Sequence, residues 1–211
     1  MTRVDIDPQA VGSGAFYRFM TSVIVPRPIA WVATRSPDGV DNLAPHSFFT
    51  VSSVDPPVVQ FTSVGRKDSL RNVEATREFV VCFTPASLFA QINATGTDFP
   101  AGESEFAAVG LEPEPSATVA PPRVAASPVA LECVLHTLVS FGSSTVVMGR
   151  VQHAVVDEDV LRDGRPAIDL LDPIARLGAT EWGRVADVRE ITRIPHRDWP
   201  GHYTPSDARH A

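Results

Sequence analysis

Two long apolar segments joined by a tight turn constrain the fold of this chain more than any other feature. The segments VALECVLHTLVSFG (129–142) and TVVMGRVQHAVVD (145–157) are rich in β-branched residues, and Gly142–Ser144 lies between them. Such a pattern predicts two long strands connected by a short reversal of the chain. The sequence therefore predicts a fold dominated by antiparallel strands.

The proline content supports the same fold class. The chain has 19 prolines in 211 residues, well above the usual frequency of about 5%. Because proline fixes φ and removes a backbone donor, this content favours short strands joined by rigid turns over a helix bundle.

The remaining segments complete a predicted barrel. SPDG (36–39) is typical of a type I turn and joins a strand at 29–35 to the segment after Val40. Further strands are expected at 42–53, 58–64, 78–84 and 187–194, and short helices at 14–22, 68–77 and 87–96. We expect residues 97–126 to form an ordered excursion that buries Phe99, Phe106 and Leu111. Residues 173–185 are expected to form a loop with a helical turn.

Closure removes exposed strand edges, so we predict a small antiparallel β-barrel with short peripheral helices. Residues 1–211 form one domain in this interpretation. Its core spans about 14–194, and residues 195–211 form a C-terminal tail.

Composition excludes several function classes. With 44% hydrophobic and 20% charged residues the chain is globular, and its net charge of −7 argues against a nucleic-acid partner. No apolar segment is long enough for a membrane span and the N-terminus lacks a signal-type apolar region, so we expect a soluble, cytoplasmic protein. The two cysteines and six histidines show no metal-site spacing. We name no metal ligand and no catalytic residue.

The stretch FTSVGRKDSLRN (61–72) raises two alternatives. A predicted strand ends at Gly65, and Lys67, Asp68 and Ser69 stand where a helix begins. A helix N-terminus attracts anions, and Lys67 would add charge to a phosphate site. Equally, Asp68 or Ser69 could simply cap the helix. The residues alone leave both alternatives open.

A second candidate surface combines RPIAWV (27–32) with NLAPHSFF (42–49). Small and apolar residues alternate there with a few polar ones, as a flat aromatic ligand requires. Two ordinary barrel strands would give the same pattern, and the residues alone favour that simpler interpretation.

Together these segments resemble the flavin reductase-like family of FMN-binding split barrels, in particular its flavoredoxin-type branch. The resemblance runs from about Phe16 to Ile194. Its most specific part is the succession of NLAPHSF, PP and KDSLRN. The pieces PRPIAWVAT, INATGTDFPAGESEFAAVGL, LEC, GRVQHAVVD and PIARLGATEW also fall in the family's order.

The resemblance implies a flavin site. It implies that the phosphate rests on the helix start, with the backbone N–H of Asp68 serving the anion while its carboxylate caps the helix. The ring would lie against the two strands, and Trp182, where the family often has tyrosine, bears on substrate preference. The implied cofactor contacts are Pro28, Ile29, Ala30, Ala44, Pro45, His46, Ser47, Ser63, Lys67, Asp68, Ser69, Asn93, Arg176 and Trp182.

The resemblance also implies an activity. Family members pass a hydride from NAD(P)H to flavin N5, and the electrons then move to an acceptor. It implies FMN as cofactor, with FAD also open, and a homodimer with the flavin near its interface. A monooxygenase or another electron acceptor would be the partner. Two alternatives stay open: a tightly FMN-bound electron carrier, and a non-catalytic flavin-binding or interaction protein.

Overall fold

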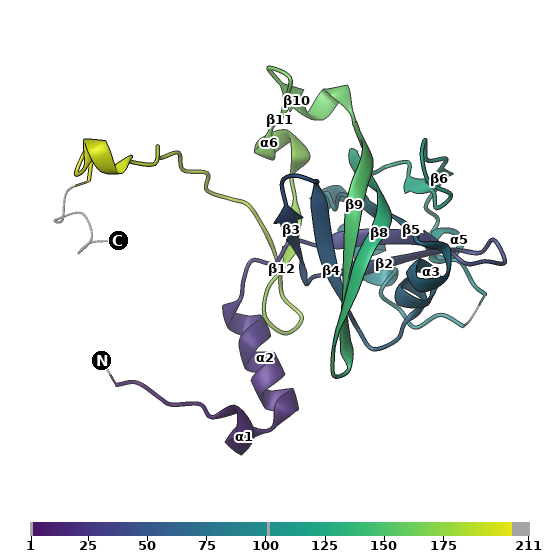
Figure 1. Cartoon of the computed structure of the whole chain (residues 1–211), viewed down its shortest axis with the longest axis horizontal. Helices are drawn as coiled ribbons and strands as arrows, with labels where there is room; N and C mark the ends of the chain where they lie inside the picture. The colour runs from purple at the N-terminus through teal and green to yellow at the C-terminus, as the bar shows by residue number, and fades with distance from the viewer. Residues whose placement is uncertain (1, 101, 204–211) are drawn as a thin grey trace.

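The computed structural model describes residues 2–100 and 102–203. At its centre is a seven-stranded sheet with the order β2-β1-β5-β8-β9-β4-β3, in which every neighbouring pair is antiparallel (Figure 1). Its strands are β1 (Ala30–Arg35), β2 (Asp41–His46), β3 (Phe49–Ser53), β4 (Val58–Val64), β5 (Glu78–Cys82), β8 (Val129–Phe141) and β9 (Ser144–Val156). The predicted antiparallel β fold is confirmed.

The sheet curls into a barrel because its two edge strands are consecutive in the chain. β2 ends at His46 and β3 begins at Phe49, so only Ser47 and Phe48 join the two edges. That length of chain spans at most about 10 Å. The edges must therefore meet, although no ladder closes them, and the barrel is split at this place.

This geometry corrects the single strand that we expected over 42–53. β2 pairs with β1 up to His46, whereas β3 pairs with β4 from Phe49 onward. One continuous strand could not serve both partners on opposite edges of the sheet. The chain therefore bends at Ser47–Phe48, where the Phe48 carbonyl accepts a hydrogen bond from Thr62 N at 2.9 Å.

The long hairpin predicted from the sequence is present. β8 and β9 pair along their whole length, and Phe141 opposes Ser144 across a two-residue turn. Gly142 has φ of 56° in this turn, a conformation that glycine adopts without steric cost. The predicted turn residues thus explain the sharpness of the reversal.

Alternation along β1 builds two hydrophobic cores. Ala30 and Val32 pack with Phe61 and Phe79 inside the barrel, while Trp31 and Ala33 pack into a second cluster on the other face of the sheet. Successive strand residues point to opposite faces, so β1 is buried on both sides. The two cysteines belong one to each cluster and are free thiols, as expected.

The helices are short and peripheral, as predicted. α3 begins at Asp68 and adds Leu70 and Val73 to the core inside the barrel. Figure 1 shows α3 beside one end of the barrel and α2 outside it. The helices are α1 (Pro8–Val11), α2 (Ser13–Val23), α3 (Asp68–Thr76), α4 (Phe89–Ala94), α5 (Glu105–Ala108) and α6 (Ile168–Leu171), with 3₁₀ turns at Ala86–Leu88, Glu158–Val160 and His196–Asp198. Among the described residues, no helix combines the length and apolar character needed to cross a membrane.

The excursion at 97–126 is ordered by buried carboxylates as well as by apolar side chains. Phe106 and Leu111 are buried as expected, whereas Phe99 is only half-buried. β6 (Pro113–Glu114) pairs with β7 (Arg123–Val124). Glu132 on β8 is fully buried and accepts hydrogen bonds from Ala117 N at 2.9 Å and from Thr118 N and Oγ1 at 2.6 Å.

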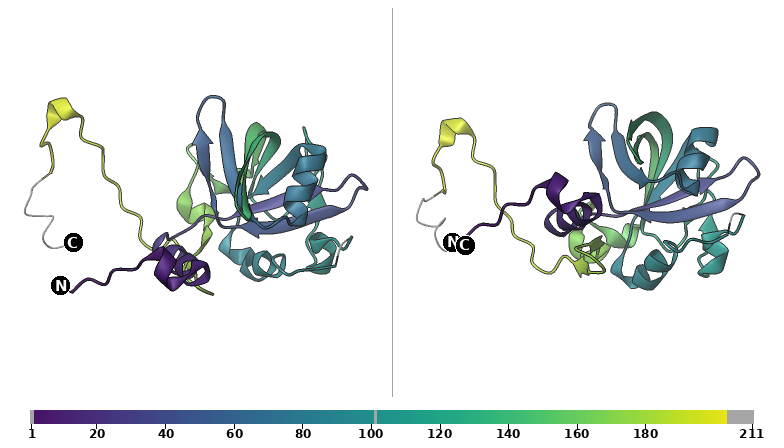
Figure 2. Two further views of the ribbon diagram at one scale, coloured as in Figure 1. Left: turned by 60° about the horizontal axis from the view of Figure 1, so that its bottom comes forward. Right: turned by 90° about the horizontal axis from the view of Figure 1, so that it is seen from below.

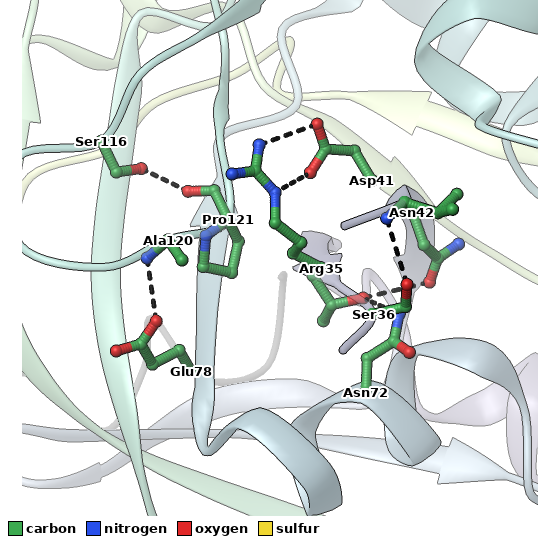
Figure 3. Close-up of polar contacts among 11 residues, drawn as sticks. Arg35, Ser36, Asp41, Asn42, Asn72, Glu78, Ser116, Ala120 and Pro121 are labelled. Atoms are coloured by element: carbon green, nitrogen blue, oxygen red, sulfur yellow. Dashed lines mark hydrogen bonds and ion pairs between the residues drawn. The ribbon is translucent and has the colours of Figure 1, made fainter. Parts of the chain in front are cut away.

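A second carboxylate anchors the same excursion. Glu78 on β5 accepts a hydrogen bond from Ala120 N at 2.8 Å, and Ser116 Oγ bonds Pro121 O nearby (Figure 3). Two adjacent strands of the sheet therefore hold the loop through side-chain oxygens.

Two predictions near the C-terminus are wrong. Residues 173–185 form a small hairpin of β12 (Ile174–Arg176) and β13 (Trp182–Arg184) rather than a loop with a helical turn; the helical turn, α6, precedes it. A further hairpin pairs β10 (Leu161–Arg162) with β11 (Arg165–Pro166). The alternating residues 187–194 form no strand, because no described strand lies beside them and Ile191 is 82% exposed.

Glu132→Gln should destabilise the protein by about 2–4 kcal/mol, because the amide replaces an acceptor by a donor facing buried N–H groups. Burial alone raises the pKa of Glu132, but hydrogen bonds from Thr118 and Ala117 outweigh burial and hold the pKa below its ordinary value. The ionised carboxylate therefore stabilises the fold above the unfolded-state pKa, and this stability is lost as pH falls through the lower folded-state pKa.

Urea unfolding at pH 7 would measure the change. Glu78→Gln is the matched control, since Glu78 holds the same loop from a half-buried position and should cost less. Equal losses for the two variants would contradict the role given to Glu132.

Candidate functional site

A large cavity lies at the split in the barrel. It measures about 610 Å³ and is bordered by the end of β2, the first turn of α3 and the loop after α4. Seven of the residues predicted from the sequence line it: Ala44, Pro45, His46, Ser47, Lys67, Asp68 and Ser69.

A smaller cavity of about 270 Å³ continues the first one. Pro45, Ser47 and Gly96 line both, so the two form one groove across the end of β2. The smaller cavity adds four further predicted residues, Ile29, Asn93, Arg176 and Trp182. Segments far apart in the sequence thus meet in a single groove.

Three predicted residues lie outside the groove lining. Pro28 is exposed, and Ala30 is fully buried in the core inside the barrel. Ser63 is also fully buried, and its hydroxyl donates a hydrogen bond to the Gly65 carbonyl at 2.8 Å. Ala30 and Ser63 therefore shape the strands beneath the groove and do not present a side chain to it.

The start of α3 has no side-chain cap. Lys67 occupies the N-cap position with extended backbone angles, and no cap hydrogen bond from a side chain is formed. The expected capping by Asp68 is wrong, because its carboxylate is held by Arg71 three residues along the helix. Ser69 Oγ donates instead to Asn42 Oδ1 at 3.2 Å. The first-turn N–H groups of α3 thus keep the positive end of the helix open to an anion.

Basic side chains surround this helix end. Arg66, Lys67 and Arg71 all line the larger cavity, and Lys67 is the only lysine in the chain. Arg66 pairs with Glu74 at 2.7 Å, while Lys67 lies 3.7 Å from the exposed Asp98. A surface pair of that length stabilises little, so Lys67 can exchange Asp98 for a bound anion.

A buried polar network forms part of the groove wall, and no local sequence pattern predicts it. Glu105 on α5 accepts hydrogen bonds from Asn42 Nδ2 at 2.7 Å and from Leu43 N at 2.8 Å. Asn42 Oδ1 in turn accepts a hydrogen bond from Ser69 Oγ, so the network connects β2, α3 and α5. Glu105 lies more than 60 residues from Asn42 in the chain, and no local motif marks such a contact.

His46 is an uncharged residue of the groove wall. Its ring packs 4.6 Å from the ring of Phe61, and its Nε2 lies 3.3 Å from Ser69 Oγ. Burial lowers the pKa of His46 to about 4, so the imidazole is neutral around pH 7. It can shape the groove and exchange hydrogen bonds, but it carries no charge there.

Arg27 fixes the far end of the groove and was also missed. Its buried guanidinium donates to the carbonyls of Thr21, Ile24 and Leu177, and its Nε lies 3.5 Å from Ser47 Oγ. It therefore ties the end of α2 and the β12–β13 hairpin to the groove. The flanking prolines in PRP predict a rigid backbone there, and no local pattern predicts the carbonyl partners of this side chain.

An aromatic and cationic stack borders the smaller cavity. The Arg176 guanidinium lies 4.5 Å from the ring centroid of Trp182, and Phe89 packs edge-on against the same ring at 5.1 Å. Arg176 and Trp182, both implied as cofactor contacts, thus lie against each other at one border of the groove.

Comparisons with known proteins agree with the arrangement. The model of the "Flavin reductase like domain" family matches residues 20–172. An uncharacterized protein of Deinococcus radiodurans is 36% identical, over 94% of this chain and 93% of its own length.

Two solved structures superpose closely. One is nitrilotriacetate monooxygenase component B from Bacillus cereus, with 30% identity, a TM-score of 0.87, and coverage of 90% of this chain and 100% of that one. The other is the 2-nitrobenzoate 2-nitroreductase of Pseudomonas fluorescens, with 30% identity, a TM-score of 0.84, and coverage of 92% and 97%.

The match to the family model covers most of the chain. The chain belongs to the flavin reductase-like family and has its split-barrel fold.

Proposed function

We propose that the groove binds FMN and that the protein is a flavin-dependent oxidoreductase. The observation that carries the proposal is the start of α3, which opens into a cavity of about 610 Å³ without a side-chain cap and beside the only lysine. A phosphate group satisfies backbone N–H groups and a lysine at once. Among the implied contacts, Lys67, Asp68 and Ser69 hold this group.

The rest of the groove fits a flat ring. Pro45 and Ser47 present little side-chain bulk at the junction of the two cavities, and Ala44 presents little in the larger one. A Cβ on Gly96 would lie 3.2 Å from Asn93 O and 3.5 Å from Pro45 Cγ, so a larger residue would narrow the same junction. In this proposal the ring lies there, and His46, Asn93 and Trp182 provide its polar and aromatic edges.

The bound flavin would supply the hydride chemistry, with NAD(P)H as donor to N5. The residues of the chain bind, orient and shield the reacting groups. His46 is neutral at pH 7 because its pKa is about 4, so it does not serve as a charged acid. FAD in place of FMN would need room for its adenylate beyond the α3 end.

The reduced flavin could pass its electrons to either of two kinds of acceptor. The similarity to a monooxygenase component favours transfer of reduced flavin to a partner oxygenase. The similarity to a nitroreductase favours reduction of a small molecule on the protein itself. A tightly FMN-bound electron carrier and a non-catalytic flavin-binding protein remain the alternatives. A cytoplasmic location suits both NAD(P)H and the two free thiols.

A homodimer is part of the proposal. Residues 186–203 leave the barrel as an extended arm, and α2 stands outside the barrel as well (Figures 1 and 2). The arm exposes Ile191 at 82% and Trp199 at 61%, and α2 exposes Tyr17 and Val23. Apolar side chains exposed in this number favour contact with another subunit. α2 also carries Tyr17 to the larger cavity, which would bring the flavin near that interface.

Lys67→Ala should weaken FMN binding by about 1–3 kcal/mol, the scale of a charge-assisted hydrogen bond, and leave the melting temperature nearly unchanged. FMN titration followed by flavin fluorescence would measure the affinity. Arg165→Ala on β11, an exposed arginine outside both cavities, is the control for lost positive charge. An unchanged FMN affinity together with a lower melting temperature would show that Lys67 serves only the helix.

The visible spectrum of the freshly purified protein should show bound oxidised flavin if FMN is held as a prosthetic group. A colourless protein that binds added FMN and oxidises NAD(P)H would make flavin a passing substrate. Tight FMN binding without NAD(P)H oxidation would support the non-catalytic alternative. No FMN binding at all would refute the proposal.

Removal of residues 186–211 should convert a dimer into monomers, because the apolar side chains that the arm exposes would be buried on another subunit. Size-exclusion chromatography with light scattering would give the mass of both forms. Ile191→Ser is a milder variant and should weaken the dimer in the same direction. A full-length protein that is monomeric at high concentration would contradict the dimer.

A further inference from the structure

Two arginines face each other beside the smaller cavity. Arg27 and Arg176 form an isolated antiparallel bridge in which each backbone N–H donates to the other residue's carbonyl, at 2.9 and 3.0 Å. Like charges directly opposite each other in such a pair are destabilising. Within residues 2–100 and 102–203, neither arginine forms an ion pair with a carboxylate.

Arg27 is used by the fold but keeps its charge. Its hydrogen bonds go to the carbonyls of Thr21, Ile24 and Leu177, and these partners are neutral. Burial, followed by the nearby charge of Arg176, lowers the pKa of Arg27. Behind Arg176, the bridge therefore holds a buried positive charge without a counter-ion from the described residues.

Arg176 lines the cavity, and most of its N–H donors are not used in hydrogen bonds to the described residues. It stacks on Trp182, and only its Nη2 has a protein partner among the described residues, the Ala179 carbonyl at 2.8 Å. A guanidinium has five N–H donors in one plane. Asp172, just before the hairpin, is already held by Arg184 at 2.6 Å, and Glu181 in the hairpin turn is exposed and forms no ion pair with Arg176.

The volume of the smaller cavity and the side chains that line it limit the class of ligand that it can bind. About 270 Å³ lies below the roughly 300–1,000 Å³ of sites for drug-sized molecules, so the cavity suits a single ring with small substituents. Ile29 and Pro45 give it apolar walls, and Trp182 gives it an aromatic one. A planar group that carries one negative charge matches both the walls and the arginines.

We propose that the smaller cavity binds small aromatic carboxylates, with the carboxylate on Arg176 and the ring toward the junction at Pro45 and Ser47. Arg27 contributes to this site through its charge and by fixing the hairpin, and is a positioning residue. The binding itself requires only residues of this chain. The role of the ligand, as a molecule that meets the flavin at the junction, rests on the proposed function.

Benzoate and its neutral isostere benzamide are the probes. Isothermal titration of the FMN-loaded protein should give benzoate an affinity about tenfold or more above that of benzamide, the value of a charge-assisted bidentate contact. Arg176→Gln should remove this preference and change benzamide binding little. Arg184→Gln, in the same hairpin but paired with Asp172, is the matched control and should keep the preference.

Arg176→Lys is a second variant, for the case that the glutamine variant does not fold. Lysine retains the positive charge but lacks the planar fork of the guanidinium. This variant should keep part of the preference for benzoate. FMN affinity is measured for every variant, and the benzoate titration is repeated without FMN. Loss of FMN binding with retained benzoate preference would refute the proposed function and leave this site standing.

Three results would overturn the site. Benzoate could fail to bind, or it could bind no better than benzamide. In the third result, Arg176→Gln raises the KM for NAD(P)H, and the unsubstituted protein has no affinity for benzoate. In that case the arginine recognises the phosphates of a nucleotide, and the carboxylate site does not exist.

Discussion

The two-residue connection between β2 and β3 is the constraint on which the rest of the structure depends. Ser47 and Phe48 join opposite edges of a seven-stranded sheet, so the sheet has to curl, and the edges meet without a ladder between them. An open edge exposes backbone and leaves room beside it. The groove lies at this split, and Ser47 lines both of its cavities. The closure of the barrel and the position of the site therefore have one cause.

Much of this fold could be predicted from local sequence. The turn at Gly142, the turn SPDG and the helix start at Asp68 are each set by a few adjacent residues, and the structure has all three. The failed predictions depend on distant partners. Residues 187–194 alternate as a strand does, yet no described strand lies beside them. The division of 42–53 requires knowledge that β4 pairs with its second half.

The candidate site divides in the same way. The family motifs predicted the residues that line the groove, because those lie on short contiguous stretches. They could not distinguish a side chain that lines the groove from one beneath it, so Ala30 and Ser63 were included although both are buried. Glu105 and Arg27 escaped prediction because their roles arise from contacts with segments distant in the chain or from carbonyl groups that no motif records.

The two ends of the groove differ in how far their positive charges are exposed to solvent. The chain is acidic, with a net charge of −7, yet each end of the groove gathers cations. Arg66, Lys67 and Arg71 surround the start of α3, while Arg27 and Arg176 adjoin the smaller cavity. The first group lies largely in solvent, where salt weakens its attraction. Arg27 is buried, so its field is screened less. Anion binding at the proposed α3 site should therefore depend more on ionic strength than binding at the proposed Arg176 site, and this difference separates the two proposals experimentally.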